Sequence, residues 1–120
     1  MKLMTKAQRT LLVRQNAMNL ERINDDGNTI DFKPVIKLFN PCGAATWLIS
    51  ELDPDTNTMF GLCYLGQGLG EPSLGYVSLD ELEDYTNAWG LGIERDIHWV
   101  AEKKLSEYAS EARARGTINV

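Results

Sequence analysis

The residues best suited to chemistry lie around the single histidine of the chain. Glu94, Asp96 and His98 occur at every second position, so they would share one face of an extended strand. Two carboxylates and an imidazole on one face could bind a metal ion or transfer protons. A solvent-facing strand, or an ion pair with a basic residue elsewhere, is the simpler interpretation, because structural metal sites need three or four strong ligands. We therefore predict no catalytic residue, metal or cofactor, and keep as an alternative polar site Glu94, Arg95, Asp96 and His98.

Two further segments match known binding loops only in part. The glycine-rich stretch 66–70 lacks the last glycine and the following helix that a dinucleotide-binding loop needs, so it is interpreted as a flexible connection. The segment 53–57 begins like a calcium-binding loop, but Thr58 and Tyr64 replace the glycine and the glutamate that such a loop requires. Turn formation explains both segments.

The two cysteines, Cys42 and Cys63, are too few for a disulfide scaffold. Nucleophilic catalysis by either would need a base, and His98 is the one available. We interpret both as buried structural thiols and leave their reactivity open. No apolar run is long enough to span a membrane, and charges interrupt the N-terminus, so we expect a cytoplasmic protein that does not bind membranes.

Negative charge is concentrated in the middle of the chain. Residues 41–100 hold ten acidic residues and one basic residue, Arg95, within a chain whose net charge is −5. Such a block repels nucleic-acid phosphates and favours a basic protein partner, although a solvated face that aids solubility is a plain alternative. The expected partner-binding patch comprises Glu51, Asp53, Asp55, Asp80, Glu81, Glu83 and Asp84, with Trp89 as an anchor.

These residues need a scaffold, and helices are predicted at three places. Thr5 can cap a first helix that runs to about Leu20, with an apolar stripe of Ala7, Leu11 and Met18. A middle helix is expected after Ser78, with an inner side formed by Leu79, Leu82, Tyr85 and Trp89. A third helix should cover residues 105–115 and end at Gly116.

Between the helices, the apolar patterns predict about five strands, at residues 35–39, 45–52, 59–65, 74–77 and 93–100. Trp47 and Ile49 should face one side of the sheet and Leu48 the other. Because the strands follow one another through short turns, we expect one α+β domain over residues 1–120. It should contain a mainly antiparallel sheet with the helices on one face.

Several stretches resemble a bacterial family, domain of unknown function 2958. The similar stretches keep the same order and cover about residues 3–113; they are residues 38–41, 45–55, 60–66, 74–82 and 90–99. Leu-Gly-Tyr-Val-Ser-Leu-Asp-Glu-Leu at 74–82 and Gly-Leu-Gly-Ile-Glu-Arg-Asp-Ile-His-Trp at 90–99 are representative. The chain departs from the family pattern at Ser73 and Gly92, both in turns.

The resemblance implies a setting and no reaction, because the family is uncharacterised and occurs often on plasmids, integrative elements and phages. Small acidic proteins of mobile genetic elements are frequently anti-defence factors. We therefore expect a non-enzymatic inhibitor of anti-CRISPR or anti-restriction type, which binds a host defence complex by protein–protein contacts. A small enzyme or metal-dependent module centred on residues 94–98, and an accessory protein of plasmid maintenance or conjugation, remain alternatives. The oligomeric state stays open.

Overall fold

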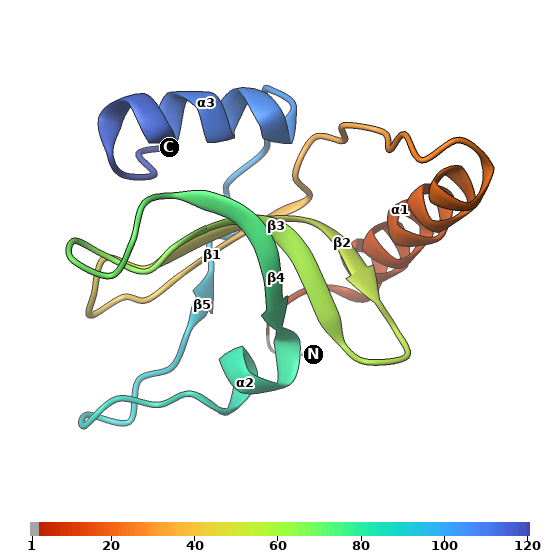
Figure 1. The fold of residues 1–120 in the computed structure, drawn as a ribbon. Helices are drawn as coiled ribbons and strands as arrows, with labels where there is room; N and C mark the ends of the chain where they lie inside the picture. The colour runs from red at the N-terminus through yellow and green to blue at the C-terminus, as the bar shows by residue number, and fades with distance from the viewer. Residues whose placement is uncertain (1–2) are drawn as a thin grey trace.

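The computed structural model describes residues 3–120 as one five-stranded sheet with three helices against it (Figure 1). The sheet order is β4-β3-β2-β1-β5, and every neighbouring pair is antiparallel. The predicted α+β fold is thus confirmed. In chain order the elements are α1 (Lys6–Asp25), β1 (Ile36–Phe39), β2 (Thr46–Asp53), β3 (Thr58–Tyr64), β4 (Ser73–Ser78), α2 (Leu79–Asp84), β5 (Glu94–Arg95) and α3 (Leu105–Arg115).

Each face of the sheet has its own hydrophobic core, and Figure 1 shows α3 and α2 on opposite sides. Trp47 and Ile49 pack with α1 and α2 in the first core, whereas Leu48 packs with α3 in the second, as their alternation predicts. The expectation that all helices cover one face was wrong. The sequence of β2 explains why, because Leu48 also needs an apolar cover.

The first helix packs through a partly polar stripe. Thr5 accepts a hydrogen bond from the Gln8 backbone N–H, which confirms the predicted cap. The residues that α1 buries are Leu12, Gln15 and Asn19, and the predicted stripe of Ala7, Leu11 and Met18 was wrong. The buried amides have backbone partners, since Gln15 Nε2 donates to Ser50 O at 2.6 Å and Asn19 exchanges hydrogen bonds with the backbone of Ile30.

A bulge in β2 changes which face its side chains occupy. Ile49 and Leu52 are three residues apart, yet both are buried in the first core. Strict alternation would put them on opposite faces, so the register shifts between Ile49 and Glu51. Opposite the bulge, Gly61 lies so close to β2 that an added Cβ would be 2.0 Å from the Leu48 carbonyl oxygen. As a result, Glu51 pairs with Phe60 on the α3 side.

The segment after β4 is less regular than the sequence predicts. The middle helix ends at Asp84, because the Asn87 side chain accepts hydrogen bonds from the backbone N–H groups of Trp89 and Leu91 and holds a tight turn. The fifth strand has two residues, because Asp96 accepts from the His98 backbone N–H and starts another turn. Among the helices of residues 3–120, none is both long and apolar enough to cross a membrane.

Candidate functional site

The acidic residues of α2 and of the β2–β3 turn lie next to each other. Thr58, which follows the turn, pairs with Ser78, the residue that caps α2. Asn57 connects the two segments, since its carbonyl oxygen accepts from Leu79 N at 2.9 Å and its side chain donates to Asp80 at 3.2 Å. Six predicted acids therefore share one end of the molecule. We call these six and Trp89 the α2 surface: Asp53, Asp55, Asp80, Glu81, Glu83, Asp84 and Trp89.

The α2 surface keeps most of its negative charge. Asp55, Asp80, Glu81 and Asp84 are exposed. The ion pairs within residues 3–120 join Lys37 to Asp96 and Lys103 to Glu111, and neither involves Asp80, Glu81 or Asp84. The Arg9 side chain comes near, but it donates to Asn57 Oδ1 at 3.2 Å. These four exposed carboxylates produce a field that attracts a basic partner.

Trp89 projects from the tight turn of residues 86–92, which the Thr86–Gly92 bridge closes. The middle-helix prediction put Trp89 on an inner side, and this was wrong, because the residue is 80% exposed. Figure 1 shows the whole segment between α2 and β5 extending away from the sheet. An exposed indole costs solvation free energy, and such side chains are enriched at the centres of protein interfaces.

An apolar groove of about 400 Å³ begins at the base of this turn. Tyr85 and Ile93, which flank the turn in the sequence, both line it. Leu65 and Leu69 from the glycine-rich connection form another wall, and Glu81 contributes a carboxylate at the edge. This groove could not be predicted from the sequence, because its walls come from segments that are far apart in the chain. The arrangement combines apolar contact area with negative charge.

Glu51 does not belong to the α2 surface, and the predicted patch is therefore not contiguous at this residue. The bulge turns its side chain to the α3 side, where it is half-buried and accepts a hydrogen bond from Asn19 Nδ2 at 2.8 Å. Burial raises the pKa of the Glu51 carboxyl, and the Asn19 hydrogen bond opposes that increase. The odd spacing of Ile49 and Leu52 was the signal that could have revealed this.

The alternative polar site is dispersed. Arg95 Nη1 donates to Gln8 Oε1 at 3.3 Å, whereas the Asp96 carboxylate faces Lys37 at 3.7 Å and accepts from the backbone of His98. Glu94 and His98 are exposed. Glu94 and Arg95 form a two-residue strand, and Asp96 and His98 lie in the turn after it. The shared strand face assumed from the sequence therefore does not form. In the described part of the chain, no group of three His, Cys, Asp or Glu residues is placed to hold a metal ion.

With this geometry established, comparison with known proteins identifies the family. The family model described as "Protein of unknown function (DUF2958)" matches residues 3–119. The chain belongs to this family. The resemblance seen in its sequence motifs is confirmed over nearly the whole chain. No curated protein and no solved structure matches the chain.

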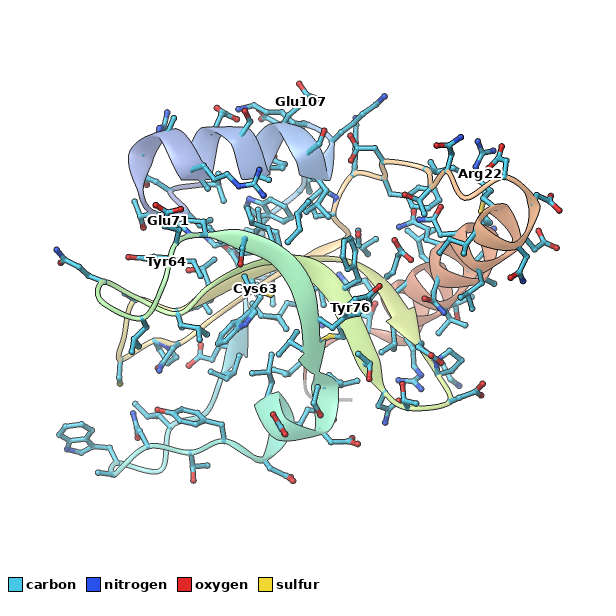
Figure 2. The ribbon with its side chains drawn as sticks, in the orientation of Figure 1. Arg22, Cys63, Tyr64, Glu71, Tyr76 and Glu107 are labelled. Atoms are coloured by element: carbon cyan, nitrogen blue, oxygen red, sulfur yellow. The ribbon has the colours of Figure 1, made fainter. Side chains whose placement is uncertain are left out.

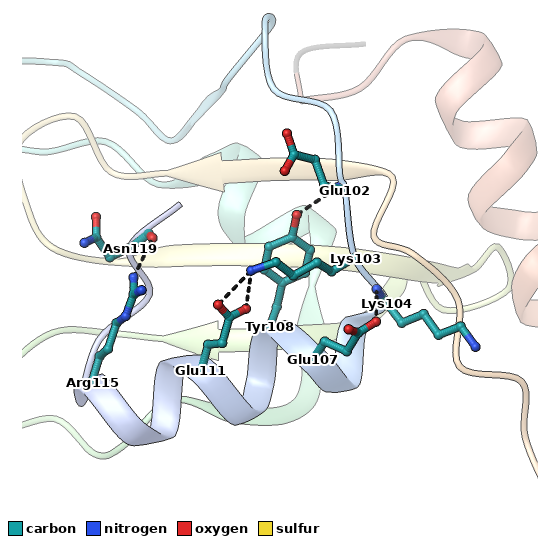
Figure 3. A network of polar contacts seen from close by, with 8 residues as sticks. All are labelled: Glu102, Lys103, Lys104, Glu107, Tyr108, Glu111, Arg115 and Asn119. Atoms are coloured by element: carbon teal, nitrogen blue, oxygen red, sulfur yellow. Dashed lines mark hydrogen bonds and ion pairs between the residues drawn. The ribbon is translucent and has the colours of Figure 1, made fainter.

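The polar network around α3 gives this DUF2958 protein a second charged area (Figure 3). Lys103 Nζ donates to Glu111 Oε1 at 2.7 Å and lies 5.5 Å from the centre of the Tyr108 ring. The hydrogen bond from Lys103 lowers the pKa of the Glu111 carboxyl, and the same contact raises the pKa of the Lys103 ammonium. Tyr108 Oη accepts from Glu102 N at 2.9 Å. The charges compensate each other and hold the segment before α3 against the helix.

The two cysteines are free thiols in different surroundings. Cys63 lies in β3 (Figure 2), and burial raises the pKa of its thiol to about 11. That side chain is therefore protonated at neutral pH, in agreement with a structural role. Cys42 is exposed in the turn between β1 and β2, so the expectation that it is buried was wrong.

Proposed function

We propose that this protein is a binding protein that attaches to a basic surface of another protein through the α2 surface. The observation that carries the proposal is the combination of exposed carboxylates on α2 with an exposed Trp89 in the turn that follows this helix. Opposite charge speeds association and sets orientation, while a buried aromatic side chain supplies most of the contact energy. The adjoining groove of about 400 Å³ offers a place for an apolar side chain of the partner.

The proposed partner is a nucleic-acid-binding host defence complex. Such a complex must present a groove rich in Lys and Arg for phosphates, because those residues provide most of its affinity. A row of carboxylates on α2 can occupy that groove and exclude the nucleic acid. This proposal combines the charge of the surface with the mobile-element setting expected for the family. It makes the protein an inhibitor of anti-CRISPR or anti-restriction type, with no reaction of its own.

The first test neutralises α2 while preserving side-chain shape. The variant carries four substitutions: Asp80→Asn, Glu81→Gln, Glu83→Gln and Asp84→Asn. A matched control changes the net charge equally at exposed positions outside the α2 surface: Glu21→Gln, Glu71→Gln, Glu94→Gln and Glu102→Gln. Each protein is expressed with a nuclease-based defence system, and both phage plating and capture of the defence complex are measured. We expect the wild-type protein and the control to increase phage plating and to capture the defence complex. The α2 variant should do neither.

A second test removes the anchor. Trp89→Ala should weaken binding by roughly 30-fold, since interface hot spots contribute about 2 kcal/mol or more. The comparison variant is Tyr76→Ala, which removes the side chain of a residue that is 76% exposed, on the other face of the sheet. Equal binding by wild type and by both the Trp89 and α2 variants, with all proteins folded, would show that the α2 surface is not the interface. Capture of a complex of plasmid-transfer or plasmid-partition proteins through the same surface would assign the protein to plasmid maintenance or conjugation.

A further inference from the structure

A separate cavity lies on the α3 side of the sheet, on the face opposite α2. Its volume is about 250 Å³, and it lies between α3, the segment before β1 and the strands β2, β3 and β4. The carboxylates of Glu51 and Asp31 are its charged groups. Its apolar walls come from elements that are far apart in the sequence, and the main ones are Ile30, Phe32, Phe60, Leu74 and Leu105. The cavity is independent of the α2 surface and of its proposed partner.

Glu51 has spare hydrogen-bonding capacity in this cavity. Asn19 Nδ2 contacts its Oε2 atom at 2.8 Å, and we find no second donor to the carboxylate among residues 3–120. No Lys or Arg of that part of the chain forms an ion pair with it. A half-buried carboxylate has room for several hydrogen bonds, so one neutral donor leaves it poorly compensated.

The other carboxylate is already occupied. Asp31 accepts hydrogen bonds from both the backbone N–H and the hydroxyl of Ser106, in the first turn of α3. It adds negative charge at the edge of the cavity without offering the same free oxygen atoms. The charge of both residues disfavours an anion. A divalent metal ion would need more oxygen ligands than these two side chains offer, and no metal-binding group was found in the described chain.

The walls select the rest of the ligand. Phe60, Leu74 and Leu105 provide apolar contact, and the Phe60 ring is supported by Tyr76 with ring centres 5.2 Å apart. Aromatic faces and a carboxylate together favour a cation, because the π-system attracts positive charge. A long alkyl stem can cover the apolar walls while its charged end reaches Glu51.

We propose that this cavity binds an organic cation with an aliphatic stem, an alkylammonium or alkylguanidinium group, with Glu51 as its counter-ion. This chemistry occurs in free diamines and in the side chains of lysine and arginine. In either case the charged nitrogen donates to the free oxygen of Glu51, and the stem packs along Phe60 and Leu74. Asn19 is a positioning residue, because it holds the carboxylate and the Ile30 backbone without touching the ligand.

The test is a titration of the full chain with cadaverine, agmatine and the blocked peptide acetyl-Gly-Lys-Gly-amide, followed by NMR. We expect saturable binding with a Kd on the order of 1 mM. The largest changes in NMR chemical shift should occur at Phe60 and Leu74. Glu51→Gln keeps the shape and the acceptor for Asn19, and it should weaken binding at least tenfold. Glu94→Gln removes an exposed carboxylate elsewhere and should leave binding unchanged. Tighter binding of the peptide than of cadaverine would indicate a protein partner as the source, and the reverse a free diamine.

The pH dependence provides a second readout. Because the pKa of Glu51 is raised, the affinity of the wild-type protein for the cation should fall as acidification protonates this carboxyl. Asp31 is the other titratable group that lines the cavity. Glu51→Gln should lack that component. The proposal is overturned if none of the three cations shifts the cavity resonances, or if Glu51→Gln binds them as well as wild type does. Neither result depends on the α2 surface, so the two proposals succeed or fail separately.

Discussion

Replacing Gly61 by alanine tests the bulge that presents Glu51. Gly61 lies in β3 opposite Ile49, and an added Cβ would be 2.0 Å from the Leu48 carbonyl oxygen and 2.9 Å from Ile49 Cα. Both neighbours are backbone atoms of a buried strand. Real Cβ atoms essentially never come closer than 3.0 Å, so β2 and β3 must separate by about 1 Å at the centre of the sheet.

The expected destabilisation is about 3 kcal/mol. Forcing extra volume into a packed core costs about 1–3 kcal/mol, and the upper end applies here because the crowded atoms belong to the backbone. Weakening a ladder hydrogen bond adds about 0.5–1.5 kcal/mol. Alanine restricts the unfolded chain more than glycine does, which offsets about 0.4–1 kcal/mol. In a chain of this length, a loss of 3 kcal/mol should lower Tm by roughly 10 °C.

Gly75→Ala is the matched control. Gly75 pairs directly with Gly61 across β3 and β4, but an added Cβ there meets nothing within 4 Å. That substitution should leave the free energy of unfolding within about 0.5–1 kcal/mol of wild type. Urea unfolding and thermal melts of both variants provide the measurement. Equal stability of the two variants would refute the close approach of β2 and β3 that supports the bulge.

Two further predictions follow from the buried ionisable groups. The pKa of Glu51 in the folded state lies above its ordinary value of 4.5, so the folded state binds the carboxyl proton more tightly than the unfolded state does. The stability that this proton contributes is lost as pH rises through the folded pKa. Relative to wild type, Glu51→Gln should therefore gain more stability at pH 7 than at pH 4 in urea unfolding, and an equal change at both pH values would contradict the raised pKa. Because burial moves the Cys63 pKa from 9.0 to about 11, iodoacetamide at pH 8 should modify Cys63 of a Cys42→Ser variant about 100-fold more slowly in the folded protein than in the same variant unfolded in urea. Comparable rates would contradict it.

The regular parts of the fold could be predicted because local signals agreed with one another. Thr5 and Ser78 cap the helices they were expected to cap, and Gly116 ends α3 with a φ of 79°. The alternation in β2 correctly divided Trp47 and Ile49 from Leu48. Such features depend on neighbours within a few residues, which the sequence displays directly.

The errors arose where a side chain satisfied a distant or competing backbone group. Gln15 and Asn19 form the buried side of α1 because the bulge carbonyl and the Ile30 backbone need partners, and no helical periodicity reveals that need. Asn87 diverts the middle helix into a turn and thereby exposes Trp89. For the candidate site, the helix that Ser78 caps brings the acids of α2 together, but the position of Glu51 depends on a one-residue insertion whose effect spans the sheet.

The same bulge explains how one strand can serve both proposed sites. Without it, Glu51 would join Ile49 on the side of the sheet covered by α1 and α2, where its charge would be buried among apolar residues. With it, Leu52 returns to that core, and the strand ends at Asp53 beside α2. The hairpin therefore places one carboxylate in the cavity on the α3 side and directs the others toward α2. A chain with this arrangement can hold a cation on one face while a basic partner occupies the other, because the two groups of carboxylates share a scaffold and no ligand-binding residue.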